Sequence, residues 1–220
     1  MRRMRESVHL PGWKQRMLLG WRESAQRDRW GPVLVAIGWI HLSFFIICQW
    51  LYSLGDRSPI RFPALWLGEL VCVAAAIRMI AGSGWTKRSP IAGFAVRVWC
   101  TFLILSFNVA SLNTLTGFGV DWFKPVWATL STFGFASMAY ITTPWFFVPA
   151  VQMYFTGLLM ASLPQYNYLI YGLSWWLALH LIGATVHRLA HVQKDAPDTN
   201  ESQEAEPRAK PRRDIAVRLR

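Results

Sequence analysis

Long apolar segments alternate with short polar ones along most of this chain. Six of the apolar segments have about the length of a membrane-spanning helix: Gly31–Tyr52, Pro63–Gly82, Ile91–Leu112, Pro125–Thr142, Pro144–Leu163 and Tyr166–His187. A helix needs about 20 predominantly apolar residues to cross the hydrocarbon core of a bilayer. The pattern therefore predicts an all-α fold, a polytopic membrane bundle of six transmembrane helices.

The chain divides into three parts by composition. Residues 1–30 form a basic segment in which Leu10, Trp13, Met17 and Trp21 recur at helical spacing, which is typical of an amphipathic helix lying in the membrane interface. Residues 31–189 form the six-helix transmembrane domain. Residues 190–220 are charged and rich in Pro, Gln and Ser, so we expect a disordered tail.

The basic residues indicate how the bundle is oriented. The net charge of +11 comes mostly from the two ends, because residues 1–30 and residues 188–220 each hold eight Lys or Arg. Lys and Arg mark the cytoplasmic ends of spans, so both termini are expected in the cytoplasm, which requires an even number of spans. The compact form suggests the cytoplasmic (inner) membrane of a bacterium. Anionic lipid headgroups are the expected partners of both basic ends, and nucleic acid is not, since no Arg-rich helix or basic aromatic sheet pattern is present.

The boundary between the fourth and fifth segments is the least defined. Only Thr142, Thr143 and Pro144 separate them. A Thr followed by Pro is typical of a helix start, which favours two short spans joined by a tight turn. A re-entrant pair that does not cross the membrane fully is the alternative.

Ionisable groups inside the spans are few, and each is a candidate for function because burying it in lipid is costly. His41 lies in the first span, Glu69 in the second and His180 in the sixth. A carboxylate cannot reach the interface as a long Arg side chain does. Glu69 is therefore expected to pair with His41, Asn108, Asn113 or Gln152, or to be protonated.

The two histidines suggest a haem hypothesis. His41 and His180 lie at similar predicted depths, so they are candidate axial ligands of a haem b if the first and sixth helices touch. The run from His180 to His187 and Arg188 also resembles the final helix of the bacterial inner-membrane dihaem cytochrome b family, in which a His, an apolar turn, a second His and basic residues follow one another. That family has four spans and a His near the start of its second, whereas Pro63–Gly82 has none. We do not assign the chain to that family.

Glu69 supports a second hypothesis, a proton-coupled transporter of small molecules in which this carboxylate carries the proton. No internal repeat of the kind found in many carriers is seen between the two halves of the chain. Motifs of membrane metalloproteases and serine hydrolases are absent from the sequence. The function expected by elimination is a non-enzymatic accessory or binding subunit, with a membrane protein or a second copy of itself as partner and no resident cofactor or metal.

Overall fold

A computed structural model describes residues 29–56, 58, 60–85, 90–116 and 120–192. The predictions for residues 1–28 and 193–220, the interfacial helix and the disordered tail, lie outside these ranges. The described residues form six long helices and no strand: α2 (Trp30–Ser53), α3 (Arg61–Ala81), α5 (Pro90–Thr116), α6 (Val120–Ile141), α7 (Phe147–Ser162) and α8 (Asn167–Val192). Their bounds fall close to those of the six apolar segments.

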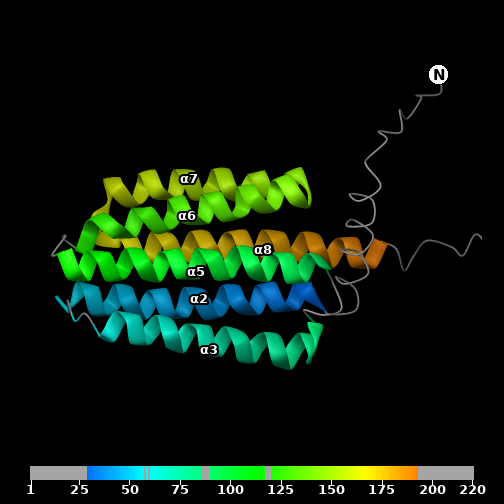
Figure 1. Ribbon diagram of the computed structural model, residues 1–220, viewed down its shortest axis with the longest axis horizontal. Coiled ribbons are helices and arrows are strands. Elements are labelled where there is room, and N and C mark those ends of the chain that lie inside the picture. The colour runs from blue at the N-terminus through cyan, green and yellow to red at the C-terminus, as the bar shows by residue number, and fades with distance from the viewer. Residues whose placement is uncertain (1–28, 57, 59, 86–89, 117–119, 193–220) are drawn as a thin grey trace, which may run out of the picture.

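The helices lie side by side along one axis, and successive helices run in opposite directions (Figure 1). As a result α2 begins and α8 ends at the same end of the bundle. The most extensive contacts join α2 to α8 and α6 to α7, followed by α2 to α3 and α5 to α6. The first and last helices of the bundle are therefore its central pair, with α3 on one side.

Within the part of the chain that the structure describes, five stretches are long and apolar enough to cross a membrane: Trp30–Ser53, Arg61–Ala81, Gly93–Leu112, Pro144–Ser162 and Pro164–Arg188. Large apolar side chains also point outward, as on α7, where Val151 is 53% and Phe155 is 61% exposed. In water such a surface would drive association, whereas in lipid it is the ordinary exterior. These observations fit an integral, multi-pass membrane protein.

Helix α6 is the long helix outside that set, and it begins earlier than predicted. It starts at Val120, so Pro125 lies inside the helix instead of opening it. The apolar pattern placed the start at Pro125 because Asp121 and Lys124 precede it. Lys124 is nevertheless fully buried, with its Nζ 3.6 Å from the centre of the Tyr52 ring. A cation over an aromatic face is stabilised inside the protein. This contact explains how α6 can contain a charged residue that lowers its mean hydropathy.

The α6–α7 connection is the tight turn that the sequence predicts. After Ile141, Thr143 is extended and the 3-10 helix η1 (Pro144–Phe146) leads into α7. Thr143 occupies the N-cap position, but its side chain makes no capping hydrogen bond. Proline at the first position of η1 agrees with the predicted helix start, because proline has no N–H group and no hydrogen-bond donor is needed at that position.

Glycines allow α2 and α8 to approach closely. A Cβ added to Gly31 would lie 3.0 Å from the carbonyl oxygen of Gly183, and one added to Gly172 would lie 2.7 Å from Cβ of Phe45. Small residues at a helix contact let two backbones meet, which is the main source of packing energy between helices in lipid. The close α2–α8 pair in turn fixes where the side chains of α2 point.

Candidate functional site

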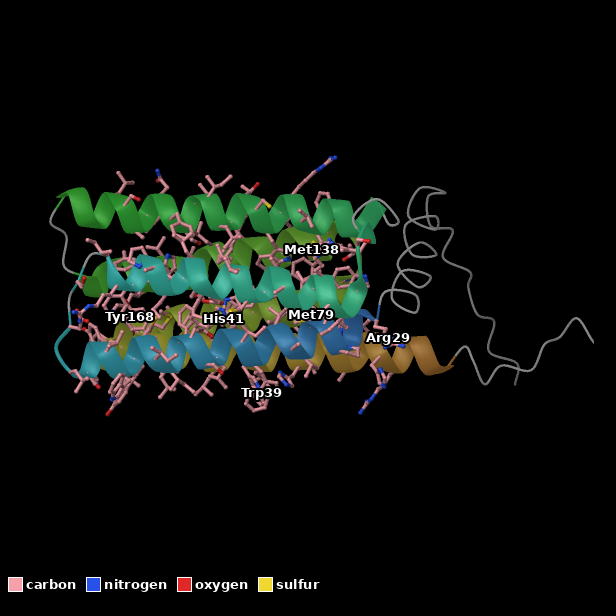
Figure 2. The ribbon with its side chains drawn as sticks, turned by 90° about the horizontal axis from the view of Figure 1, so that it is seen from below. Arg29, Trp39, His41, Met79, Met138 and Tyr168 are labelled. Carbon is pink, nitrogen blue, oxygen red and sulfur yellow. The ribbon has the colours of Figure 1, made fainter. Side chains whose placement is uncertain are left out.

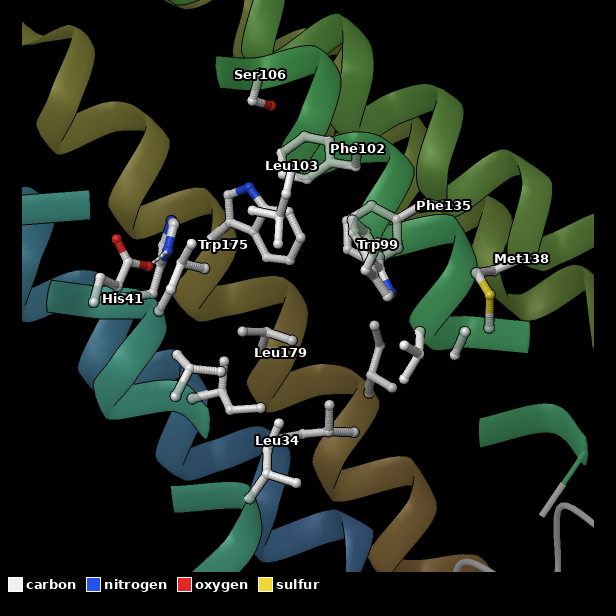
Figure 3. A pocket seen from close by; sticks show the side chains of 18 of the residues that line it. Leu34, His41, Trp99, Phe102, Leu103, Ser106, Phe135, Met138, Trp175 and Leu179 are labelled. Carbon is white, nitrogen blue, oxygen red and sulfur yellow. Dashed lines mark hydrogen bonds and ion pairs between the residues drawn. The ribbon is translucent and has the colours of Figure 1, made fainter. Parts of the chain in front are cut away.

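A cavity of about 350 Å³ lies inside the bundle and is lined by α2, α3, α5, α6 and α8. Figure 3 shows residues from four of these helices around it: Leu34, His41, Trp99, Phe102, Leu103, Ser106, Phe135, Met138, Trp175 and Leu179. Its wall is aliphatic and aromatic for most of its area, and no lysine or arginine occurs among the described residues that line it. This is the chemistry of a site for an uncharged, apolar molecule.

One buried polar pair stands in this wall. His41 on α2 and Glu69 on α3 share a hydrogen bond, with 2.5 Å between Nδ1 and Oε1. Glu69 is only 8% exposed, and His41 lies near the middle of the bundle's length (Figure 2). A buried carboxylate that holds one imidazole nitrogen fixes the ring's orientation and leaves the other nitrogen, Nε2, for a different partner.

Three aromatic rings surround the His41 imidazole. The ring centres of Phe45, Trp175 and Tyr171 lie 4.3, 5.4 and 5.8 Å from it. The Tyr171 hydroxyl is held in turn by Ser131, with 2.8 Å between the two oxygens. The imidazole is therefore clamped by packing as well as by Glu69.

Four buried polar atoms of residues that line the cavity have no hydrogen-bond partner among the described residues. They are Nε2 of His41, Oγ of Ser106 and the indole nitrogens of Trp66 and Trp175. Ser106 stands on α5 and His41 on α2, so these two residues belong to different walls of the cavity. Buried polar atoms are nearly always paired, and unpaired ones beside a cavity indicate where a ligand's polar atoms bind.

The sequence singled out Glu69, His41 and His180, and the structure brings only the first two together. His41 is among the partners expected for Glu69. His180 does not line the cavity; its Nδ1–H donates to the carbonyl oxygen of Trp176 at 2.8 Å, and its ring lies edge-on to Trp39. The α2–α8 contact that the haem hypothesis required is present, but the two histidines have separate surroundings.

His41 and His180 do not share one cavity, because His41 lines the cavity described above and His180 does not. The space beside Gly183, between His180 and His187, is filled by Gly31 and Val35 of α2. The cavity also offers no described cation for haem propionates. For metals, the described residues contain no group of three or more His, Cys, Asp or Glu that could hold an ion.

Sequence reasoning did not identify the aromatic wall or Ser106. A signal was present, because Trp99 and Trp175 lie deep in their segments, away from the membrane interface where most of the other tryptophans fall. In the structure both line the cavity, with their ring centres 5.1 Å apart. Nothing in the spacing of a serine in an apolar helix distinguishes one that faces a cavity from one that faces a neighbouring helix.

Comparison with known proteins gives no assignment: no family model, curated protein or solved structure matches this chain.

Proposed function

We propose that this protein is a non-enzymatic binding subunit of a bacterial cytoplasmic membrane that takes an apolar ligand from the bilayer into the cavity around His41 and Glu69. The observation that carries the proposal is an apolar cavity of about 350 Å³ whose wall holds one buried, hydrogen-bonded His–Glu pair. Ligand sites in proteins combine a mainly apolar wall with a few fixed polar groups, and this cavity has both.

The way into the cavity supports a ligand that arrives through lipid. Both α3 and α5 line the cavity, yet in the described part of the chain α3 packs mainly on α2 and α5 mainly on α6. The side between α3 and α5 is therefore the least tightly closed. A molecule dissolved in the bilayer reaches the cavity there without crossing a polar surface.

The orientation we propose puts the beginning of α2 and the end of α8 in the cytoplasm, with all six helices crossing. Arg29, Arg78, Arg97 and Arg188 belong to that end, because α2 begins, α3 ends, α5 begins and α8 ends there. Fewer described cations, Arg61 and Lys124, belong to the opposite end. An excess of basic residues on the cytoplasmic side is the usual rule for such proteins.

Transport is a second candidate, and one observation favours it: the cavity reaches Glu69, as a carrier that uses this carboxylate requires. The apolar wall narrows the hypothesis, because a strongly hydrated cargo would lose its hydration without replacement. A carrier built this way would move an apolar or weakly polar molecule. Movement of ligand between the two faces of liposomes separates a carrier from a binding subunit.

Mass spectrometry of molecules that remain bound to the full chain, purified in mild detergent, tests ligand binding. Val73 lines the cavity from α3, whereas Val71 on the same helix is 69% exposed on the exterior. Val73→Phe fills part of the cavity, and Val71→Phe places the same side chain in lipid. We expect Val73→Phe to lower the amount of retained apolar molecules several-fold and Val71→Phe to leave it unchanged.

Ala95→Leu narrows the cavity from the α5 side. Because this substitution is on another helix, it shows whether a loss of binding in Val73→Phe comes only from a fold defect in α3. Size exclusion and the thermal unfolding midpoint identify any variant that has lost its fold. If folded Val73→Phe and Ala95→Leu proteins retain the same molecules in the same amounts as the original, the cavity is not a binding site and the proposal fails.

A further inference from the structure

We propose that the ligand is a quinone: an uncharged ring whose carbonyl oxygens accept hydrogen bonds, carried on an apolar tail. This inference rests on the proposed binding function and names the chemical class that fills the same cavity. It depends on the protons of the His41–Glu69 pair, on the aromatic wall and on Ser106.

The pair has two electrically neutral proton arrangements. In one, an imidazolium donates from Nδ1 to a carboxylate; in the other, a protonated Glu69 donates to Nδ1 of a neutral imidazole. Nε2 carries a hydrogen in both, because the ring must bear a proton there whenever Nδ1 only accepts. The remaining arrangement, neutral His41 beside a carboxylate, buries a net negative charge, and no described lysine or arginine lines the cavity to balance it. A ligand that brings a hydrogen-bond acceptor fits the two neutral arrangements, because Nε2–H is a hydrogen-bond donor in each of them.

This donor defines what a ligand must supply. Nε2 is buried and no described group accepts its hydrogen bond. A buried donor without an acceptor costs about 1–3 kcal/mol, so a ligand that brings an acceptor gains that amount beyond its apolar contacts. Nε2 exposes less than 1 Å² to solvent, so binding of the acceptor requires a neighbouring side chain to shift. A carbonyl oxygen meets the requirement, whereas a hydrocarbon does not.

The wall around the pair favours a flat ring over a fatty acyl chain. Trp99, Phe135 and Trp175 come from three helices and form a cluster with ring centres 5.1 to 5.2 Å apart. Aromatic faces and edges of this kind pack well against another ring. Ser106 on α5 supplies a hydroxyl that has no described partner, on a different wall from His41. A quinone has carbonyl oxygens on opposite sides of its ring, so one molecule can accept from both walls.

Thermal stabilisation of the full chain by added probes tests the inference, because a ligand that binds the folded state raises the unfolding midpoint by an amount that grows with the logarithm of its concentration divided by its Kd. The probes are decylubiquinone, decylbenzene, which has a ring without an acceptor, and methyl decanoate, which has a carbonyl without a ring. We expect decylubiquinone to bind about 10- to 100-fold more tightly than decylbenzene, the factor for one hydrogen bond to a buried donor.

Variants of the pair complete the test. His41→Phe combined with Glu69→Leu removes the donor without leaving a buried carboxylate alone, and should lower decylubiquinone affinity about 10- to 100-fold while changing decylbenzene affinity far less. His41→Gln in place of His41→Phe, again combined with Glu69→Leu, supplies an amide donor and should recover part of the lost decylubiquinone affinity. His180→Phe is the matched control, a histidine outside the cavity, and should bind as the original does.

The outcomes separate this inference from the function on which it rests. If decylbenzene and methyl decanoate bind as tightly as decylubiquinone, or if the double variant keeps full decylubiquinone affinity, the protein binds apolar molecules but the quinone assignment is wrong. If none of the probes stabilises the protein and Val73→Phe retains as many molecules as the original, both proposals fail.

Discussion

His41 and Glu69 form a hydrogen bond between α2 and α3, with 2.5 Å between Nδ1 and Oε1 of residues 28 positions apart in the chain. This hydrogen bond helps to hold α3 in the bundle, because α2 is the helix on which α3 mainly packs in the described part of the bundle. The same contact sets the imidazole at the edge of the cavity. One interaction thus positions both a helix and the candidate binding group.

Breaking this pair from one side should cost more than removing it altogether. Glu69→Leu leaves a buried imidazole that has lost its partner, and His41→Phe leaves a buried carboxylate, so each single change should lower the free energy of unfolding by about 3–5 kcal/mol. The double variant should lose clearly less than the sum, since apolar side chains suit this site. Reversible unfolding in mixed micelles measures all three. Additive losses would show that the two groups are not coupled.

A second buried contact predicts an asymmetry between its two partners. The Ser131 hydroxyl donates to the Trp127 carbonyl at 2.8 Å and also lies 2.8 Å from the Tyr171 hydroxyl. After Tyr171→Phe, Ser131 keeps its backbone partner, so the loss should be about 1 kcal/mol or less. After Ser131→Ala, the buried Tyr171 hydroxyl loses its partner, and the loss should reach about 1–3 kcal/mol. Equal losses by the same unfolding measurement would contradict this geometry.

The sequence predicted the helices well because their signal is local. Each apolar segment reflects the lipid around one helix, so the bounds of that helix can be predicted without knowledge of the neighbouring helices. The start of α6 was missed because Lys124 is accommodated by rings of Tyr52 and Tyr168, from two other helices. A contact across three helices leaves no trace in the spacing of one.

The site was predictable only in part, for the same reason. The cost of burying a carboxylate marks Glu69 on its own, and the shortage of polar partners in the spans makes His41 a natural candidate. His180 carries the same residue-level signal, yet in the structure its ring packs over Gly38 and Trp176. Which face of a helix points inward depends on how the helix packs against its neighbours. The position of a residue along its own helix does not contain that information.

The α2–α8 contact should be sensitive to a single methyl group at Gly172. A Cβ there would lie 2.7 Å from Cβ of Phe45, an atom close to the α2 backbone that cannot move aside freely. Gly172→Ala should therefore force the helices apart and destabilise the protein by about 1–3 kcal/mol. Gly68→Ala is the matched control, since its added Cβ meets only a ring edge of Phe44 at 3.5 Å, an ordinary contact. A Gly172→Ala protein as stable as Gly68→Ala would refute this close approach.

The orientation can be read by labelling single cysteines in a chain whose native cysteines, Cys48, Cys72 and Cys100, are replaced by alanine. Leu54 follows α2 and is 66% exposed, and Ser83 lies beyond α3 at the opposite end of the bundle. With the basic end in the cytoplasm, Leu54→Cys should react with a membrane-impermeant maleimide added to intact cells, and Ser83→Cys only after the membrane is opened. The reverse result inverts the bundle.

The same chemistry decides whether α6 and α7 cross the membrane fully. If they do, the turn at Thr143 reaches the cytoplasmic interface and the turn at Gln165, which is exposed, reaches the outer one. Thr143→Cys should then react in inverted vesicles but not in intact cells, and Gln165→Cys should do the opposite. We expect full crossing, because α6 is 22 residues long and spans about 33 Å at 1.5 Å per residue, close to the thickness of the hydrocarbon core. In a re-entrant pair the Thr143 turn stays within the hydrocarbon, where a cysteine reacts from neither side. Labelling of Gln165→Cys alone would therefore establish re-entry.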